Sequence, residues 1–424
     1  MSTRTPTTSR AGRGGTRPAA RAGRSATTST ARRGAAPARS SSGPRADRTR
    51  ADRARRPVRR PRPVPARFPL LLAVIVVLNL VGLVMVLSAS SVEALHDLGS
   101  SWFYFNRQVI WTGIGLVALL VATKVDYHVW RRLVAPLLLV AFAALALLLV
   151  PGVGTRVNGS LSWYRFGPFS FQPAELVKLA VLLYTADLLA RRADRVDEPH
   201  ATLVPPLVVL GIAGGFLVTQ PDLGSAIVVG AIVLGVLFIG GVPLVPLTGV
   251  AAASAAVGGW VALSAGYRRA RFLAFLDPES SRLNEGYQLT QSLVGIASGG
   301  ITGVGLGESR AKWGFLPEAH TDFIFAVIAE ELGLVGCIAV VALFLTFGVL
   351  GIRVALRARD RFGTLVAGGI TAWILVQALV NLGGVVGLLP ITGLTLPFVS
   401  FGGSSLLVTM AAAGILLNVA KQGT

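Results

Sequence analysis

Residues 314–351 read GFLPEAHTDFIFAVIAEELGLVGCIAVVALFLTFGVLG, a polar approach followed by a long apolar run. A helix needs about 20 apolar residues to cross about 30 Å of hydrocarbon, so this run predicts a membrane span. Asp322 lies where the polar approach enters the apolar run. A carboxylate at the bilayer centre costs about 2.5 to 3.5 kcal/mol, and ionisable groups at such depths usually line cavities or pathways. Asp322 is therefore the first candidate for an acid or base.

Similar apolar runs recur along the whole chain of 424 residues, of which 53% are hydrophobic. They are continuous and do not alternate, which excludes a transmembrane β-barrel. The sequence predicts an all-α polytopic membrane protein with about ten transmembrane helices. The expected spans lie near residues 68–88, 109–126, 133–151, 173–190, 203–219, 224–241, 244–265, 323–351, 364–388 and 397–419.

The formal net charge of +20 comes mostly from the N-terminal segment. Residues 1–67 contain 19 arginines and two aspartates, with almost no large apolar side chain. Such a segment cannot bury a core, so we expect a disordered Arg-rich cytoplasmic tail followed by a transmembrane domain over 68–424. The basic tail is expected to contact anionic membrane lipids. It contains no folded nucleic-acid-binding domain, so we expect no specific nucleic-acid recognition.

The basic side chains of the short connections indicate the orientation. With the tail inside, the cytoplasmic connections hold Lys124, Arg131 and Arg132, then Arg191 to Arg195, then Arg353 to Arg361. Both termini are therefore expected in the cytoplasm. One large outer loop, Tyr267 to Thr321, then joins spans seven and eight. Its cations suit an anionic ligand or, alternatively, lipid headgroups: Arg268, Arg269, Arg271, Arg282, Arg310 and Lys312.

Other common site classes find no support in the sequence. The single cysteine, Cys337, and four scattered histidines predict neither a disulfide nor a transition-metal centre. The glycine-rich stretch GVGLGE lacks the third glycine of GxGxxG, and no GxxxxGK[ST] occurs, so we expect no nucleotide loop.

Three polar groups interrupt the apolar runs. Gln172, Glu175 and Lys178 open the fourth span, where Glu175 and Lys178 share a helix face and form either a structural ion pair or part of a ligand site. Gln220 and Asp222 lie in an outer turn, where Asp222 is either a helix cap or a ligand contact. Glu330 and Glu331 cannot both face one cavity with Asp322, and we expect at least one to bind a buried polar group near the inner half.

Several motifs resemble the SEDS (shape, elongation, division and sporulation) proteins, whose main branches are FtsW and RodA. The resemblance covers about residues 68 to 420 and rests on motifs that occur in order: NGSLSWYRFGPFSFQPAELVK, QPDLGSA, GYQLTQSLVGIASGGITGVGLG, KWGFLPEAHTDFIFAVIAEELG and GLLPITGLTLPFVSFGGSSLL. It implies ten spans and polymerisation of lipid II into glycan strands. The last two motifs look more like the FtsW division branch than the RodA elongation branch.

The resemblance also implies partners and a location. It implies contact with lipid II and a growing glycan strand, a class B penicillin-binding protein transpeptidase, divisome proteins and membrane lipids. It places the protein in the cytoplasmic membrane, at the division septum. The alternatives are a RodA-type elongation polymerase, a lipid II flippase, and a scaffold that recruits a transpeptidase without chemistry.

Residue roles follow from the same resemblance. The essential aspartate of the family's HTDF motif falls on Asp322, our candidate base. A pyrophosphate leaving group needs positive charge, and the candidates, in order, are Lys312, Arg165 and the Arg268 to Arg271 cluster. Glu318 and His320 flank the base and either orient it or only shape the turn. We assign no metal ligand, although a bound Mg²⁺ or Mn²⁺ is an open alternative. Ser162 stands where many members have arginine.

Overall fold

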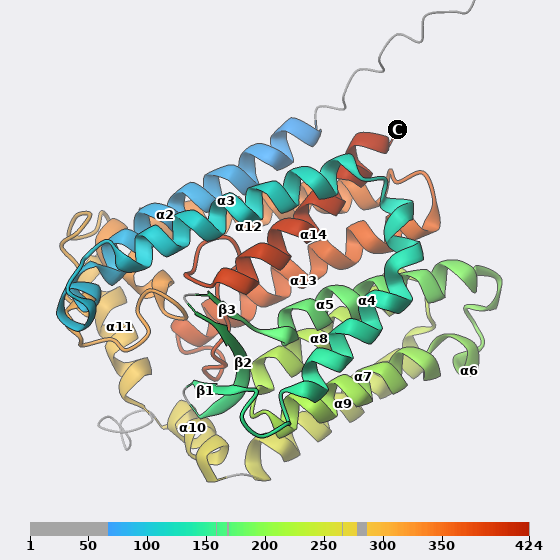
Figure 1. Cartoon of the computed structure of the whole chain (residues 1–424), viewed down its shortest axis with the longest axis horizontal. Coiled ribbons are helices and arrows are strands. Elements are labelled where there is room, and N and C mark those ends of the chain that lie inside the picture. Colours follow the sequence, from blue (N-terminus) through green and yellow to red (C-terminus); the bar gives the residue numbers. More distant parts are fainter. Residues whose placement is uncertain (1–66, 158, 168, 265, 278–285, 424) are drawn as a thin grey trace, which may run out of the picture. The chain divides into compact units, whose positions relative to one another are not determined.

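The computed structural model describes residues 67–157, 159–167, 169–264, 266–277 and 286–423 (Figure 1). The chain separates into Met1–Arg62 and Pro63–Thr424, and every described element lies in the second unit. The expected tail over 1–67 therefore lies outside the described residues, apart from Arg67.

Ten described helices correspond to the ten expected spans. They are α2 (Arg67–Leu98), α3 (Phe103–Lys124), α4 (Tyr127–Leu147), α5 (Pro173–Arg191), α7 (Val204–Thr219), α8 (Leu223–Ile239), α9 (Leu244–Ser264), α12 (Ile324–Ala355), α13 (Arg361–Val385) and α14 (Gly403–Gln422). Among the described residues, seven of these helices are long and apolar enough to cross a membrane, and α7 and α8 are apolar but shorter. The polytopic helical architecture is confirmed.

The helices run between two ends of the bundle. One end contains the connections from α2 to α3 and from α7 to α8 and the segment between α9 and α12, and we call it the sheet end. At the other, the termini end, α2 begins and α14 finishes (Figure 1). All connections with clustered arginines that we expect in the cytoplasm, such as Arg191 to Arg195, lie at the termini end.

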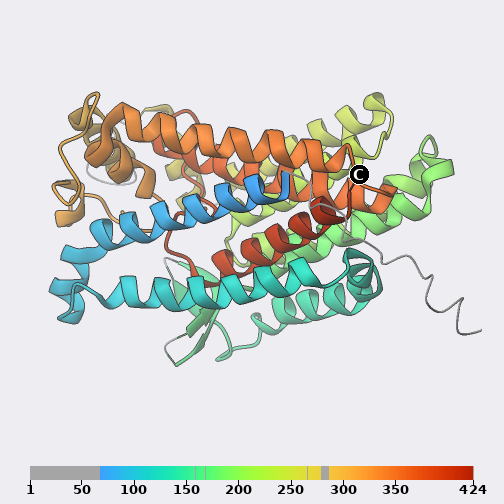
Figure 2. The same ribbon diagram turned by 90° about the horizontal axis from the view of Figure 1, so that it is seen from above.

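The core is built around the last two helices of the chain. α2 lies between α3 and α12, and α14 packs along α3 (Figure 2). α13 contacts α12, α8, α5 and α14. Both α13 and α14 are largely buried, unlike α4 and α9, whose apolar side chains remain exposed at the edge of the bundle as lipid-facing surfaces do.

Polar residues at the helix starts explain where the spans begin. Asp126 caps α4 by accepting a hydrogen bond from His128 N at 2.9 Å, and this bond lowers the pKa of the Asp126 carboxyl. Asp360 accepts a hydrogen bond from Gly363 N at 3.0 Å and so caps α13. Each carboxylate satisfies an amide that the first helical turn leaves without a partner.

A small antiparallel sheet covers part of the sheet end. Strands β1 (Thr155–Val157), β2 (Ser160–Phe166) and β3 (Phe169–Phe171) follow one another between α4 and α5. The Tyr164 hydroxyl of β2 donates to Ala144 O of α4 at 2.7 Å, and burial raises its pKa. We did not expect strands, although SLSWYRF has the polar and apolar alternation of a half-buried strand.

The predicted outer loop of residues 267–321 contains helices. It includes most of α10 (Gly266–Leu276), α11 (Tyr287–Gly299) and the 3₁₀ helix η2 (Ala311–Trp313). From the sequence we expected one large outer loop here and predicted no helix within it. One face of α11, with Leu289, Ser292, Gly295 and Gly299, is instead buried, and the helix contacts α12 and α13.

The glycine-rich segment after α11 interlocks with a break in α12. Gly333 has a φ of 64°, outside the helical range, and Gly303 has a φ of 82°. The broken helical ladder is completed by four backbone hydrogen bonds of 3.0 to 3.2 Å: Val304 N to Glu330 O, Gly305 N to Glu331 O, Leu334 N to Gly300 O, and Val335 N to Ile301 O. A Cβ on Gly303 would lie 2.1 Å from Glu331 O, so only glycine fits.

The last span begins later than expected. The apolar run predicted helix from residue 397, whereas α14 begins at Gly403 and the segment 390–402 is irregular but mostly buried. Pro397 lacks an amide hydrogen and Gly402 favours non-helical backbone, so this apolar stretch is buried without forming a helix.

Candidate active site

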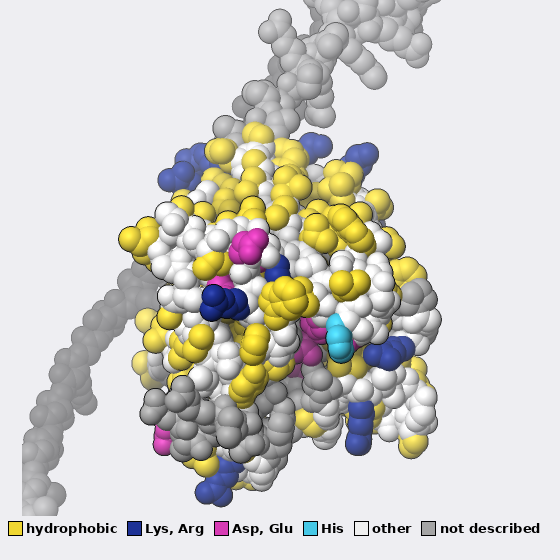
Figure 3. Space-filling model, turned by 90° about the vertical axis from the view of Figure 1, so that its left-hand side faces the viewer, with side chains coloured by type: hydrophobic (Ala, Val, Ile, Leu, Met, Phe, Trp, Pro, Cys, Tyr) yellow, Lys and Arg dark blue, Asp and Glu magenta, His cyan; other side chains and the backbone are white. Residues whose placement is uncertain are grey.

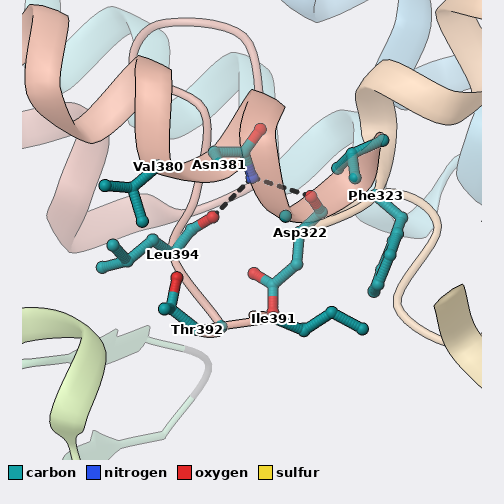
Figure 4. A pocket seen from close by; sticks show the side chains of 10 residues that line it. Asp322, Phe323, Val380, Asn381, Ile391, Thr392 and Leu394 are labelled. Atoms are coloured by element: carbon teal, nitrogen blue, oxygen red, sulfur yellow. Dashed lines mark hydrogen bonds between the residues drawn. The ribbon is translucent and has the colours of Figure 1, made fainter. Parts of the chain in front are cut away.

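Asp322 lies at the sheet end, immediately before α12. Its backbone carbonyl accepts a hydrogen bond of 2.8 Å from the Asn381 amide of α13, and the same amide donates to Leu394 O at 2.6 Å (Figure 4). Asn381 thus joins the start of α12 to the segment 390–402. The Asp322 side chain is half-buried and points towards Ile391 and Thr392.

A pocket of about 200 Å³, open mouth included, lies at this junction. Its lining comes from α13, the start of α12 and the irregular segment: Asp322, Phe323, Val380, Asn381, Gly384, Val385, Ile391, Thr392, Gly393 and Leu394. Gly393 has a φ of 70°, and a Cβ there would meet Asp322 Oδ2 at 3.6 Å. The glycine therefore leaves one side of the carboxylate uncovered.

Buried side-chain amides donate hydrogen bonds to backbone carbonyls of the irregular segment 390–402. Besides Asn381, Gln377 donates to Thr395 O at 3.0 Å, and Gln108 of α3 donates to Ser400 O at 3.3 Å. Irregular backbone within a membrane protein is tolerated where protein groups satisfy it or where it lines a cavity. The segment does both, so three buried amides determine the shape of the pocket wall.

The two residues that flank Asp322 behave differently. Glu318 shapes the turn: its carboxylate accepts from Thr321 Oγ1 at 2.7 Å, and its carbonyl accepts from Phe323 N at 3.3 Å. The His320 ring faces α2 and α3, with ring centroids 4.4 Å from Tyr104. Its Nδ1 lies 3.3 Å from Glu93 Oε2, an ion-pair distance without hydrogen-bond geometry. Whether either residue orients the base remains a prediction.

The predicted cluster around Asp222 is joined to the pocket wall. Asp222 caps α8 through a 3.0 Å hydrogen bond from Ser225 N, which confirms the cap, and its other oxygen accepts from Gln172 Nε2 at 2.9 Å. A Cβ on Gly224 would lie 2.5 Å from Thr392 O, so this turn packs closely against the segment that lines the pocket.

Gln220 is buried beside this cluster and has structural contacts. Its side-chain amide donates to Leu145 O at 2.9 Å, and its backbone carbonyl accepts from the hydroxyls of Ser160 and Ser162. Ser162, where the family often has arginine, is thus buried between the sheet and the turn before α8.

Glu175 and Lys178 form the ion pair that their spacing predicted. Lys178 Nζ lies 2.8 Å from Glu175 Oε1, and the two side chains are 0% and 4% exposed. The same ammonium donates to Gln377 Oε1 at 3.2 Å. Since Gln377 also holds Thr395 O, the pair supports the pocket wall from behind.

The candidate cations occupy three separate segments. Lys312 is buried in η2 and donates to Gly307 O, whereas Arg165 is exposed on β2 opposite Ser170 of β3. Arg269 is exposed on α10. The side chains of Arg268 and Arg271, like Arg282, lie outside the described residues. The face at the sheet end shows Lys, Arg, Asp and Glu side chains among apolar ones (Figure 3).

Glu330 and Glu331 each bind a polar group, but that group is not near the inner half as we expected. Both carboxylates contact Ser309, in the segment between α11 and α12 that belongs to the sheet end. The backbone hydrogen bonds between the glycine-rich segment and α12 bring Ser309 alongside α12. The spacing of residues within one helix could not indicate this contact.

Metal ligands do not converge in the described part of the chain. No group of three or more His, Cys, Asp or Glu side chains there is placed to hold an ion. Mg²⁺ usually binds through one or two carboxylates together with substrate phosphates. Asp322 offers one such carboxylate, so a divalent cation at this place would need the phosphates of a bound substrate as further ligands.

Comparison with known proteins identifies the family. A model of the FtsW, RodA and SpoVE proteins, described as cell cycle proteins, matches residues 69–424. The chain belongs to this family.

Named relatives of the family match most of the chain. A probable peptidoglycan glycosyltransferase FtsW of Geobacter metallireducens is 42% identical over 352 residues, which cover 83% of this chain and 94% of the relative. Stage V sporulation protein E of Bacillus subtilis is 41% identical over 355 residues, covering 83% and 96%. A chain from a solved peptidoglycan synthase complex that coordinates polymerization and crosslinking is 32% identical, with a TM-score of 0.69 and coverage of 82% and 96%.

Within this family fold, sequence reasoning missed several residues of the site. Asn381 and Gln377 are one helical turn apart in an apolar span, which is a signal of a buried polar face that we did not use. Glu93 had no such signal, because its contact with His320 joins residues far apart in the chain.

Proposed function

We propose that this protein is a peptidoglycan glycosyltransferase that polymerises lipid II. The observation that carries the proposal is Asp322, a half-buried carboxylate on a pocket at one end of a membrane bundle whose family includes probable glycosyltransferases. Relatives named FtsW at 42% identity support the division-type branch over a RodA-type elongation polymerase.

The proposed reaction is an inverting glycosyl transfer. A sugar hydroxyl of one lipid-linked disaccharide attacks the anomeric carbon of another, a new glycosidic bond forms, and the bond to the lipid pyrophosphate breaks. Asp322 takes the proton of the attacking hydroxyl. The pyrophosphate leaves without protonation, so one carboxylate suffices where a glycosidase needs two.

Positive charge at the leaving group comes from the sheet end. Arg165 is exposed on β2, whereas Lys312 is buried and bonded to Gly307 O, so we now place Arg165 before Lys312 as the first contact of the pyrophosphate. If a divalent cation takes part, Asp322 is the carboxylate that would hold it, and the ion would supply further positive charge to the leaving group.

We also propose the cellular setting. Both termini lie in the cytoplasm and the sheet end faces outwards, because the arginine-rich connections gather at the termini end. The partner is a transpeptidase of the class B penicillin-binding proteins, by analogy with the synthase complex that this fold matches. Recruitment by other divisome proteins would bring the pair to the septum.

Purified full-length protein with its transpeptidase partner tests the activity. Lipid II supplied in detergent, with crosslinking blocked by a β-lactam, is expected to yield glycan strands of many disaccharides on a gel. Detergent removes any need for translocation, so a flippase or a scaffold would give no polymer in this assay. Absence of strands, with the protein folded and the partner bound, would reject the polymerase.

Orientation is tested with two cysteine variants of matched charge change. In a Cys337→Ala background, Glu308→Cys lies in the segment between α11 and α12, and Asp197→Cys lies between α5 and α7. Both positions are exposed. An impermeant thiol reagent added to intact cells is expected to label the variant at 308 and not the one at 197. The opposite pattern would place Asp322 on the cytoplasmic side and remove access to translocated lipid II.

A further inference from the structure

The segment from Ser309 to Phe323 forms a loop whose two ends are both attached to α12, one through hydrogen bonds and the other through the chain itself. It ends where the chain enters α12 at Ile324. It begins at the side chain of Glu330, whose Oε1 accepts from Arg310 N at 2.9 Å and whose Oε2 accepts from Ala311 N at 3.2 Å and from the Ser309 hydroxyl. The Glu330 side chain therefore closes this loop.

Four of the candidate site residues lie in the closed loop. They are Lys312, Glu318, His320 and Asp322. The interlock of the glycine segment fixes residues up to Gly305, but Glu330 determines how the chain turns at 309–311. Its hydrogen bonds therefore set the position of η2, with Lys312, relative to the Asp322 end.

The Asp322 end of the loop has attachments of its own. Asn381 holds Asp322 O, and Phe401 N donates to His320 O at 3.0 Å. Losing the contacts of Glu330 would therefore loosen the turn at 309–311, which Glu331 and the packing of η2 against α2 then hold only in part, and leave Asp322 in place. Such a change affects binding of a substrate more than its chemical step.

Glu330 is only 2% exposed, so its carboxylate depends on these three donors. Hydrogen bonds to a charged acceptor are about twice as strong as those between neutral groups. An amide at this position cannot replace the carboxylate, because its NH₂ group would face a backbone N–H on either side.

We propose that Glu330 is a positioning residue for lipid II binding: it holds the 309–313 turn of the outer loop, which carries Lys312, the second cation of the proposed pyrophosphate site after Arg165. This inference rests on the proposed glycosyltransferase function. It assigns to a buried carboxylate of α12 a role that neither its depth nor its distance from Asp322 along the helix would indicate.

The neighbouring glutamate supplies a matched control. Glu331 Oε1 accepts from Ser88 Oγ at 2.6 Å and from Ser309 N at 3.4 Å, and Oε2 has no hydrogen-bond partner among the described residues. Glu331→Gln can place its NH₂ at Oε2 and keep both contacts. Glu330→Gln makes the same change in charge and shape one residue away but must lose at least one contact.

The experiment compares lipid II polymerisation by wild type and both variants, as full-length proteins with the partner transpeptidase and in equal folded amounts. Glu330→Gln is expected to raise KM for lipid II about tenfold, with kcat within about threefold of wild type. Glu331→Gln is expected to keep KM within about threefold. An unchanged KM in Glu330→Gln, or equal rises in both variants, would overturn the proposal.

Two further comparisons keep the test decisive. If Glu330→Gln does not fold, Ser309→Ala, which removes one donor to Glu330, should still raise KM about fivefold, whereas Ser88→Ala, which removes a donor to Glu331, should keep KM within about twofold. If wild type makes no polymer, the glycosyltransferase function fails by itself. The same variants are then compared for lipid II dissociation constants, where equal values would reject the role of Glu330.

Discussion

Asp322→Asn is expected to abolish glycan polymerisation while leaving the protein folded and in the membrane. The amide has nearly the shape of the carboxylate but cannot take a proton from a sugar hydroxyl, and a general base contributes about 10²- to 10⁴-fold in rate. The hydrogen bond from Asn381 goes to the backbone carbonyl of this residue, so the substitution retains it. Initial rates of lipid II polymerisation measure the loss.

The control for this variant is binding. Asp322→Asn should bind lipid II with a dissociation constant within about threefold of wild type if the carboxylate acts on the chemical step. Polymer yields close to wild type would remove Asp322 from the role of base. Lost binding with lost activity would instead assign it to holding the substrate, or a cation on the pyrophosphate.

Lys178→Met is expected to destabilise the transmembrane domain by about 3 kcal/mol or more, because it leaves the Glu175 carboxylate buried without its cation. Both side chains are almost completely buried, so water cannot replace the lost partner. Unfolding in mixed detergent, followed by tryptophan fluorescence, measures the free energy of unfolding. The pocket wall at Thr395 should loosen as well, since Gln377 loses the ammonium that it faces.

A double variant separates the charge from the packing. Glu175→Leu with Lys178→Met removes both charges and keeps apolar volume, and replacements of this kind are often neutral or stabilising. We expect its free energy of unfolding to lie closer to wild type than that of the single variant. A single variant as stable as wild type would show that the ion pair does not hold this region together.

The local sequence predicted those contacts that lie within one helix or one turn. The three-residue spacing of Glu175 and Lys178 predicted their ion pair, and the position of Asp222 before an apolar run predicted its cap. Both interactions depend only on the geometry of a single helix. The pattern of arginines likewise separated the connections into two groups that the fold gathers at opposite ends.

Contacts between distant segments were not predictable in this way. Residues 397–402, at the end of the segment 390–402, looked like helix because apolar composition reports burial and not backbone conformation. The sequence did not indicate which segment would approach Gly303 and gave no reason to single out Gly333, yet these two glycines let two segments approach to hydrogen-bonding distance. Our ranking of Lys312 as the first cation also changed, since its burial follows from packing of η2 against α2.

The sequence by itself determined that this is a polytopic membrane protein with about ten spans, and it singled out Asp322 as the carboxylate to explain. Hydrophobic length and the cost of placing charge in lipid decide both points without any knowledge of packing. Only the tertiary structure decided that Asn381 joins Asp322 to Leu394 and that Glu330 closes the loop before α12. Buried polar groups must find partners, and in a folded bundle those partners come from whichever segment lies nearest in space.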